Sequence, residues 1–517
     1  MTLSSPAPPR AAITSPTIPA ARAATASWTL LVLVALAAVL RFATLRQQSY
    51  WYDEAVTVHL VRDSFGAMLR RIPQTESTPP VYYAVTWGWS RVFGNGEVGL
   101  RSLSAIAGTA TVPLVYRSGR RLGGRPAGLV AGGLAAVSPF FIWYAQEARA
   151  YALIALLCAA SLLLYLRART RPSPGRLAAW AAVSAVALAT HYFAVFVVGP
   201  ELAFLIAGAQ GRARRRVVAA GAALVPVAGV LLPVAVAQRD SGRTAWIAHI
   251  PLADRIGQVP LQFLSGLGER LVPDLGVVLG LAVVAGVLVL LRRLTPPLRG
   301  ETARVLAIGA AGVALPLVLA AAGADELLSR NAIVALPALM VGTATVLAAP
   351  ATRRFGLSLA AVAAALGLAG TAAVVIDPAL QRPAWRTAAR LIGDAGAVRA
   401  IVAPGGFRAL PLEIYLHRAD SFPKGRHAVP QVVELGAQGG PGACWWGAVC
   451  DLPTRAAPRR PPLPGFTFAG SARAGRFTVS RFDAARPARV SARQLGLTTA
   501  VRGRLLVLVD PVEREDR

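Results

Sequence analysis

The chain has 517 residues, of which 55% are hydrophobic and only 15% are charged. This composition excludes an ordinary soluble globular protein and is typical of a polytopic membrane protein. The net charge of +29 does not indicate a nucleic-acid-binding protein, because the arginines form short blocks between apolar runs.

The N-terminal segment, residues 1–26, is rich in Pro, Ser and Ala and contains no acidic residue. This composition predicts a disordered cytoplasmic tail. The apolar run from Trp28 to Leu40 could be the core of a signal peptide, but no clear small-residue cleavage site follows it. We therefore favour an uncleaved first membrane helix.

A membrane-spanning helix needs about 20 predominantly apolar residues. Runs of this kind recur about eleven times and predict an all-α transmembrane domain over residues 27–376. The expected spans are residues 27–44, 98–116, 126–144, 150–167, 176–190, 192–210, 216–236, 274–292, 303–323, 331–349 and 355–376. The fifth and sixth spans are separated only by the residues THYF and could be drawn differently.

The arginine blocks fall in alternate loops between these spans and predict the topology. They are the segments YRSGRRLGGR, LRARTRPSPGR, GRARRR, LRRLTPPLRGETAR and ATRRF. The positive-inside rule places these loops in the cytoplasm. The extracytoplasmic segments are then residues 45–97, 145–149, 190–192, 237–273, 324–330 and everything after about 377.

The first outer loop, residues 45–97, places two adjacent acids, Asp53 and Glu54, directly after the first span. Ionisable groups at a membrane boundary carry a desolvation cost, so they are functional candidates, although an isolated acidic pair can also be a solvated loop feature. Glu76 precedes a Pro pair in the same loop. The aromatic residues that follow suit the membrane interface, and we expect the loop to form short amphipathic helices on the membrane surface.

The second polar stretch is WYAQEARAYAL, which falls at the outer turn between the third and fourth spans. It brings together Gln146, Glu147, Arg149 and Tyr151. An arginine there suits a phosphate or diphosphate through planar bidentate hydrogen bonds. A salt bridge between Glu147 and Arg149 that only fastens the turn is an equal alternative.

Other polar residues fall on the same predicted face. Arg101 opens the second span, His191 and Tyr192 lie in an outer turn, and Arg330 precedes the tenth span. A single His or Arg at such a position can also be a snorkelling side chain. No motif of an ATP-driven pump, a zinc protease or a serine hydrolase is found.

Residues 377–517 differ in character, because Pro, Gly and Arg rise and the long apolar runs stop. PAWRTAARLIGDAG predicts an amphipathic helix with a glycine stop, and VRAIVAP, GRFTVSRF and RLLVLVD predict short strands. The region is therefore expected to be a small extracytoplasmic α/β domain. If this region is outside the cell, Cys444 and Cys450 are expected to form a small-loop disulfide, and two unpaired thiols are the alternative because spacing alone does not fix the geometry.

At these residues the chain resembles the GT-C superfamily of integral membrane glycosyltransferases. It is most similar to glycosyltransferase family 39 and its relatives, which include protein O-mannosyltransferases and bacterial aminoarabinose transferases. The resemblance covers about residues 27–350. It rests on the segments YDEA, ESTPPVYY, GLRSLSA, YAQEARAYAL, THYF and SRNAIVALPAL in this order. Thr78 before the Pro pair and Asn331 after Arg330 depart from the pattern of many relatives.

The resemblance implies transfer of a sugar from a polyprenyl-phosphate donor to a protein, glycan or lipid acceptor at the outer face of the plasma membrane. Mannose is the default sugar, and a pentose is the alternative. Asp53 would be the general base, and the attack would invert the anomeric carbon. Glu54 and Glu76 would orient acceptor or sugar hydroxyls or hold an ion, and Arg101, Arg149 or Arg330 would bind the phosphate. No cofactor is implied; some GT-C enzymes use a divalent metal, but this pattern does not clearly require one.

Three other functions fit parts of the pattern. A transporter or flippase of a lipid-linked sugar would need mid-membrane charges or internal symmetry, and neither is clear in the sequence. A polymerase or ligase of the same membrane fold would differ mainly in its outer loops. A protein with a degenerate, inactive site is the third alternative.

Overall fold

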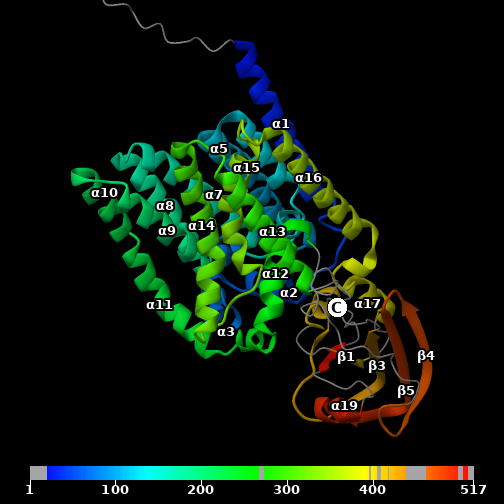
Figure 1. The fold of residues 1–517 in the computed structure, drawn as a ribbon. Helices are drawn as coiled ribbons and strands as arrows, with labels where there is room; N and C mark the ends of the chain where they lie inside the picture. The colour runs from blue at the N-terminus through cyan, green and yellow to red at the C-terminus, as the bar shows by residue number, and fades with distance from the viewer. Residues whose placement is uncertain are drawn as a thin grey trace, which may run out of the picture.

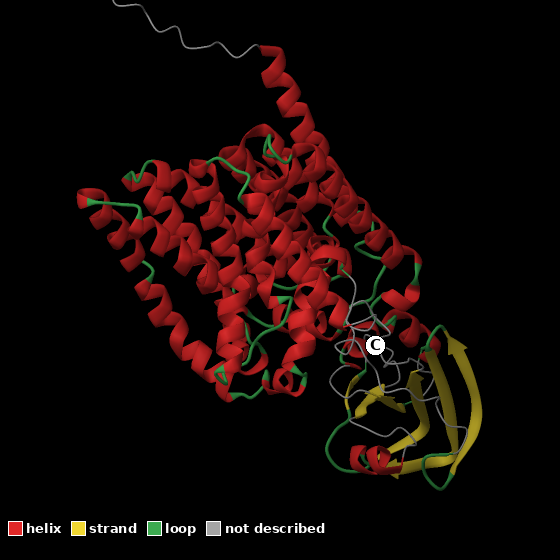
Figure 2. Cartoon of the chain, viewed as in Figure 1, coloured by secondary structure: helices red, strands yellow, loops and turns green. Residues whose placement is uncertain are grey.

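The protein consists of a large bundle of helices followed by a smaller unit built on a β-sheet (Figures 1 and 2). The structure is a computed structural model, and it describes residues 20–266, 273–394, 398–404, 409–416, 419–437, 461–498 and 505–510. The predicted N-terminal tail lies outside these residues up to residue 19. Cys444 and Cys450 also lie outside them, so the predicted disulfide stays a prediction.

Six helical segments in the described residues are long and apolar enough to cross a membrane. They are α5 (Glu97–Val137), α7 (Tyr151–Thr170), α10 (Gly211–Ala222) with α11 (Val225–Asp240), α14 (Pro296–Ala321), η3 (Asn331–Ala335) with α15 (Leu336–Ala348), and α16 (Arg353–Ile376). Shorter apolar helical segments lie in α1 (Ala20–Phe42), in η1 (Tyr192–Ala194) with α9 (Val195–Ala207), and in α13 (Pro273–Leu291). The prediction of a multi-span helical membrane protein is confirmed. The predicted number of spans is eleven, whereas six helical segments of the described residues meet the criteria of length and apolar composition.

Helix α5 accounts for part of this difference, because it contains two of the predicted spans. Its backbone leaves the helical conformation at Gly123 and Gly124, where Gly124 has a φ of 80° that favours glycine. The two arms then fold back on each other: a Cβ on Gly128 would lie only 2.9 Å from the backbone oxygen of Tyr116. The predicted spans 98–116 and 126–144 are therefore the arms of a helical hairpin, and α6 (Pro139–Ala145) continues the second arm.

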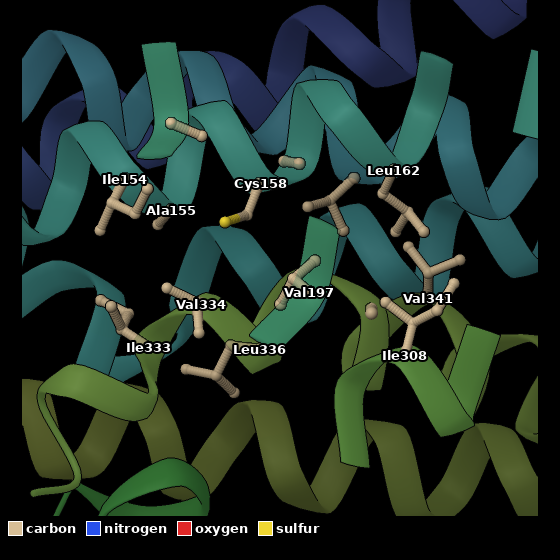
Figure 3. Close-up of a cluster of buried hydrophobic side chains, with 14 of the residues drawn as sticks. Ile154, Ala155, Cys158, Leu162, Val197, Ile308, Ile333, Val334, Leu336 and Val341 are labelled. Carbon is tan, nitrogen blue, oxygen red and sulfur yellow. The ribbon is translucent and has the colours of Figure 1, made fainter. Parts of the chain in front are cut away.

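The hydrophobic core of the bundle is centred on α7. Ile154, Cys158 and Leu162 lie along one face of α7, opposite Val334 of η3, Val197 of α9 and Ile308 of α14 (Figure 3). Cys158 is only 1% exposed and packs as a small apolar side chain. Helix α8 (Pro174–Thr190) also packs on α7. This core positions the C-terminal end of α6 and the N-terminal end of α7, which flank the polar residues 146–149.

The first outer loop folds into three short helices, as predicted. They are α2 (Tyr52–Arg62), α3 (Phe65–Thr75) and α4 (Val81–Phe93). They lie at the same end of the bundle as the sheet unit, whereas α10 lies toward the opposite end (Figure 1). The expectation of an interfacial aromatic belt is wrong for Tyr82 and Tyr83, which are fully buried. Each packs between helices of the outer loop instead of facing lipid.

The C-terminal unit is a six-stranded mixed sheet with the strand order β2-β6-β1-β3-β5-β4. Strands β1 and β3 are parallel, and the other neighbouring pairs are antiparallel. The strands are β1 (Arg399–Pro404), β2 (Asp420–Ser421), β3 (His427–Ala437), β4 (Phe466–Ala474), β5 (Phe477–Val490) and β6 (Leu505–Asp510). The helix and the three strands predicted from the sequence are confirmed.

Helices cover both faces of this sheet. Helix α17 (Trp385–Ile392) packs Trp385 against Phe477 and Val479, and α19 (Ala492–Thr498) packs Leu495 against the opposite face. Gly393 ends α17 with a φ of 73°, which agrees with the predicted glycine stop. The short elements η4 (Pro378–Leu380) and α18 (Pro411–Tyr415) contact α16 and α2, respectively, and so join this unit to the bundle.

Candidate functional site

The two adjacent acids of the first outer loop lie in the first turn of α2, where the positive end of the helix dipole favours carboxylates. Successive residues of a helix point about 100° apart, so neighbouring side chains diverge. Glu54 points into the protein and is completely buried, whereas the side chain of Asp53 keeps 15% exposure. The sequence pair DE therefore supplies two carboxylates with different surroundings.

Glu54 forms a buried bidentate ion pair with Arg101 of α5. The Nε and NH2 groups of Arg101 lie 2.7 and 2.6 Å from the two carboxylate oxygens. The backbone N–H of Ala148 donates a further hydrogen bond of 2.9 Å. Burial by itself raises the pKa of Glu54, but the charge and hydrogen bonds of Arg101 outweigh it and the pKa lies below its ordinary value. Glu54 is thus held ionised within a closed network.

Asp53 faces Arg330, at a distance of 3.0 Å from the carboxylate oxygen Oδ2 to the guanidinium nitrogen NH1. Arg330 keeps 16% exposure and lies over the rings of Tyr151 and Trp246, each 5.9 Å from its guanidinium carbon. The two partners are 277 residues apart in the sequence. The structure therefore brings together the predicted base and one of the predicted phosphate-binding arginines.

Glu76 and Arg149 form a second bidentate pair, with distances of 3.1 and 2.9 Å. Both side chains are largely buried, and Tyr83 lies beneath the guanidinium group. Arg149 also approaches the backbone oxygen of Asp53 at 3.4 Å. This contact ties the turn between α6 and α7 to the start of α2.

Glu147 pairs with Arg382 and not with Arg149, so the predicted alternative of a Glu147–Arg149 salt bridge is not observed. Its oxygen Oε2 lies 2.8 Å from the NH2 group of Arg382, and both side chains are 1% exposed or less. Burial raises the pKa of the Glu147 carboxyl to about 7, although the charge of Arg382 acts in the opposite direction. We refer to residues 146–150 as the α6–α7 turn.

The remaining predicted residues lie around this group. Gln146 donates to the end of α1 and to Thr44. Tyr192 donates to Gln238 of α11, 2.8 Å away. His191 is 3% exposed, and its Nδ1 accepts from a backbone N–H. Burial, Arg149 and Arg330 lower the pKa of His191 to about 3, so its ring is neutral.

The segment that carries Arg330 is braced by α12 (Leu252–Ser265), which follows the short helix η2 (Ala245–His249). Arg255 of α12 forms a bidentate pair with Asp325, with both distances at 2.6 Å, and also donates to the backbone of Leu327. Ser329 donates to Gln262 of the same helix. The position of Arg330 thus depends on α12, a helix that no sequence motif marks.

Three residues of this site were not identified from the sequence: Trp246, Arg255 and Arg382. Each lies in a segment predicted to be extracytoplasmic, but none belongs to a recognisable motif. Arg382 is one of 54 basic residues in the chain, so its type alone carries no signal. Within the described parts of the chain, no group of three or more His, Cys, Asp or Glu side chains is arranged to hold a metal ion.

Part of the chain matches a known family. Residues 77–236 match the family model described as dolichyl-phosphate-mannose-protein mannosyltransferase. The matched segment includes Arg101, Glu147, Arg149 and His191. Over these residues the chain is therefore similar to a family of membrane glycosyltransferases, and the resemblance stated from the sequence is confirmed there. No curated protein matches the chain.

Solved structures of membrane glycosyltransferases are similar to the chain at low identity. ArnT from Cupriavidus metallidurans in the apo state is 18% identical with a TM-score of 0.46, and the match covers 65% of this chain and 62% of that chain. The S. cerevisiae protein O-mannosyltransferase Pmt1-Pmt2 complex bound to the sugar donor is 18% identical with a TM-score of 0.34, covering 42% and 34%. The Archaeoglobus fulgidus oligosaccharyltransferase is 13% identical with a TM-score of 0.46, covering 72% and 58%.

Proposed function

We propose that the protein is a membrane glycosyltransferase that moves a sugar from a polyprenyl-phosphate donor to a hydroxyl of an acceptor, with Asp53 as general base. The observation that carries this proposal is the difference between Asp53 and the three acids around it. Glu54, Glu76 and Glu147 are at most 3% exposed, and each is paired with an arginine. Asp53 is the most accessible of the four carboxylates.

An accessible carboxylate in this position suits the reaction expected of the family. The acceptor hydroxyl must lose its proton as it attacks the anomeric carbon, and a positioned base contributes roughly 10²–10⁴-fold to the rate. The bond from the anomeric carbon to the phosphate oxygen breaks, and the polyprenyl phosphate leaves as an anion. The proton passes to the Asp53 carboxylate.

Arg330 is the cation best placed to bind the donor phosphate. Arg101 and Arg149 are each held by a buried carboxylate in a bidentate pair, whereas Arg330 makes one contact with Asp53 and is more exposed. A phosphate that competes for Arg330 would weaken its contact with Asp53. Donor binding would thereby leave the carboxylate free to accept the proton of the acceptor.

The buried pairs then act as positioning elements. Glu54 and Arg101 fix α2 against α5, and Glu76 and Arg149 fix the α6–α7 turn against the outer loop. We propose that Glu54 positions Asp53 and does not itself react, because its carboxylate is fully buried and its hydrogen bonds are already made to the protein. His191, with its neutral ring, could bind a hydroxyl of the sugar.

We further propose that this site lies on the extracytoplasmic face of the plasma membrane, with eleven spans over residues 27–376. The family description supports a lipid-phosphate sugar donor. Mannose is the first sugar to test, and a pentose is the alternative. The unit formed by residues 377–517 is proposed to face the same side and to contact a protein, glycan or lipid acceptor.

The function is tested with the purified protein in lipid nanodiscs and radiolabelled polyprenyl-phosphate mannose or polyprenyl-phosphate arabinose, with cell-envelope extract as acceptor. We expect label to transfer from the lipid phase to an acceptor. In sealed proteoliposomes, donor movement across the bilayer without transfer would instead support a transporter. A folded protein that transfers no sugar from any such donor would contradict the proposal.

A further inference from the structure

The α6–α7 turn contacts several parts of the outer face at once. Gln146 bonds to the C-terminal end of α1. The N–H of Ala148 donates to Glu54 at 2.9 Å, and Arg149 reaches the backbone oxygen of Asp53 at 3.4 Å. The position of this turn therefore affects the backbone that carries the proposed base.

One charged group holds the turn from the side of the sheet unit. Arg382 lies between η4 and α17, is 3% exposed, and places NH2 2.8 Å from Glu147 and NH1 3.3 Å from the backbone oxygen of Gln146. Its own N–H donates to the side chain of Gln48 at 2.9 Å. Its guanidinium group lies 4.2 Å from the ring centre of Trp143, a cation–π contact. Arg382 thus contacts residues from two separate segments, residues 143–147 and the connection from α1 to α2.

Glu147 depends on this cation. Its carboxylate is completely buried, and within the part of the chain that the structure describes no group hydrogen-bonds to its oxygen Oε1. A buried carboxylate without a counter-charge is costly and takes up a proton. The other charged or titratable groups near it are Asp53, Glu54, Tyr144, Tyr151 and Arg330. Two of them are acids, which add to the need for a cation.

We propose that Arg382 is a positioning residue for sugar transfer: by holding the carboxylate of Glu147, it fixes the α6–α7 turn and, through that turn, the placement of Asp53 opposite Arg330. This inference rests on the proposed function. It makes the segment leading into the sheet unit a part of the active site. The sheet unit would then have a role beyond contacting the acceptor.

The alternative is that Arg382 only fastens the sheet unit to the bundle. Other contacts already do this: Arg386 of α17 and Tyr415 of α18 both bond to Glu97 of α5, and Tyr415 accepts from the N–H of Tyr50 at 2.7 Å. None of these contacts involves the α6–α7 turn. Loss of Arg382 should therefore change the reaction while the sheet unit stays attached.

The test compares full-length variants of Arg382 with matched controls. Arg382→Met removes the charge and keeps much of the apolar stem, and Arg382→Lys restores a charge without the planar fork. Arg386→Met removes a docking arginine, and Arg390→Met removes an exposed arginine from the same helix. Each is assayed for kcat, for KM of the donor, for the pH dependence of kcat and for thermal stability. The double variant Glu147→Gln/Arg382→Met removes both partners.

We expect Arg382→Met to lower kcat by roughly 10- to 100-fold, as for a displaced catalytic group, with little change in the KM of the donor. In the wild type, protonation of the Glu147 carboxylate releases Arg382, so this protonation should contribute to the acidic limb of the pH profile, and the contribution should be absent from Arg382→Met. Arg382→Lys should recover part of kcat, and the double variant should show the same acidic limb as Arg382→Met. Both control variants should keep the wild-type pH profile.

The proposal is overturned if the wild type transfers sugar and Arg382→Met keeps the wild-type kcat and pH profile. It is also overturned if Arg382→Met and Arg386→Met lose activity equally and in proportion to lost stability, because that result indicates docking alone. A folded wild type that transfers no sugar overturns the proposed function, and this inference with it. Activity of the wild type thus separates the two failures.

Discussion

Glu54 and Arg101 join α2 to α5 through two parallel hydrogen bonds of 2.7 and 2.6 Å, and both side chains are 1% exposed or less. Arg101 also donates to the backbone oxygens of residues 45, 48 and 49, which form the connection from α1 to α2. One side chain thereby organises the start of the outer loop. Asp53 is attached to this anchor by a single peptide bond.

Removal of this anchor should destabilise the protein strongly. Arg101→Met leaves the Glu54 carboxylate buried without its partner, and breaking a buried pair in this way costs about 3–5 kcal/mol. The free energy of unfolding is measured by denaturant titration in detergent micelles. Arg70→Met, at an exposed position of α3, is the matched control and should change it by less than about 0.5 kcal/mol. Equal free energies of unfolding for Arg101→Met and Arg70→Met would show that the Glu54–Arg101 pair does not stabilise the fold.

The close approach of α5 to the end of α6 should tolerate no side chain at Gly108. A Cβ there would lie 2.6 Å from the Cβ of Ala145 and 3.1 Å from the guanidinium Nε of Arg41. We expect Gly108→Ala to destabilise the protein by about 1–3 kcal/mol, because the neighbouring helix must move. Gly133→Ala is the control, since nothing lies within 4 Å of its added Cβ. It should be neutral or slightly stabilising in the same denaturation assay, and equal losses would contradict the packing argument.

Glu434 in the sheet unit should make stability depend on pH. It is fully buried on β3, no described residue hydrogen-bonds to its carboxylate, and burial raises its pKa to about 7. The unfolded chain releases this proton near pH 4.3, so between about pH 4.3 and 7 the folded state binds more protons. The stabilising effect of the proton is complete below that window and is lost as pH rises through it.

Glu434→Gln imitates the protonated acid and should remove this dependence. Relative to wild type it should be unchanged at pH 4 and more stable at pH 8, by on the order of 1–3 kcal/mol. Asp483→Asn, at an exposed position on the neighbouring strand β5, is the control, and its stability relative to wild type should not rise between pH 4 and pH 8. A stability difference between Glu434→Gln and wild type that is constant from pH 4 to 8 would refute a raised pKa.

Arg330 should determine the affinity for the donor. Arg330→Gln removes the charge that we assign to the phosphate, and hydrogen bonds to charged groups contribute about 1.5–3 kcal/mol, or roughly a 10- to 100-fold loss of affinity. Binding of polyprenyl phosphate alone is measured by calorimetry in nanodiscs, without turnover. Arg330→Lys should retain part of the affinity. If Arg330→Gln binds polyprenyl phosphate as tightly as wild type, the phosphate lies elsewhere.

The sequence predicts the fold to a useful level because apolar runs and arginine blocks are local signals. Hydropathy locates the helices, and the predicted topology puts Asp53 and Arg330 on one side of the membrane although they lie far apart in the chain. The two arms of α5 correspond to two separately predicted spans, and the helix breaks between them at Gly123 and Gly124. These features depend on short stretches of sequence.

The ion-pair partners could not be predicted in the same way. Glu147 and Arg149 stand two residues apart, and yet each pairs with a distant residue, Arg382 and Glu76. Partner choice depends on how helices and loops pack, which no local pattern records. The burial of Glu54 is likewise a tertiary property, since its neighbour Asp53 has the same charge and remains accessible.

The most direct test of the account is the rate of sugar transfer by Asp53→Asn, compared with wild type at saturating polyprenyl-phosphate sugar. The substitution keeps the shape of the side chain and removes its basicity. We expect kcat to fall by roughly 10²–10⁴-fold, with thermal stability and polyprenyl phosphate binding retained. Glu76→Gln serves as a comparison. It breaks the ion pair with Arg149, so any fall in kcat should be accompanied by a lower thermal stability of the protein. A folded Asp53→Asn protein that transfers sugar at the wild-type rate would contradict the assignment of Asp53 as the base.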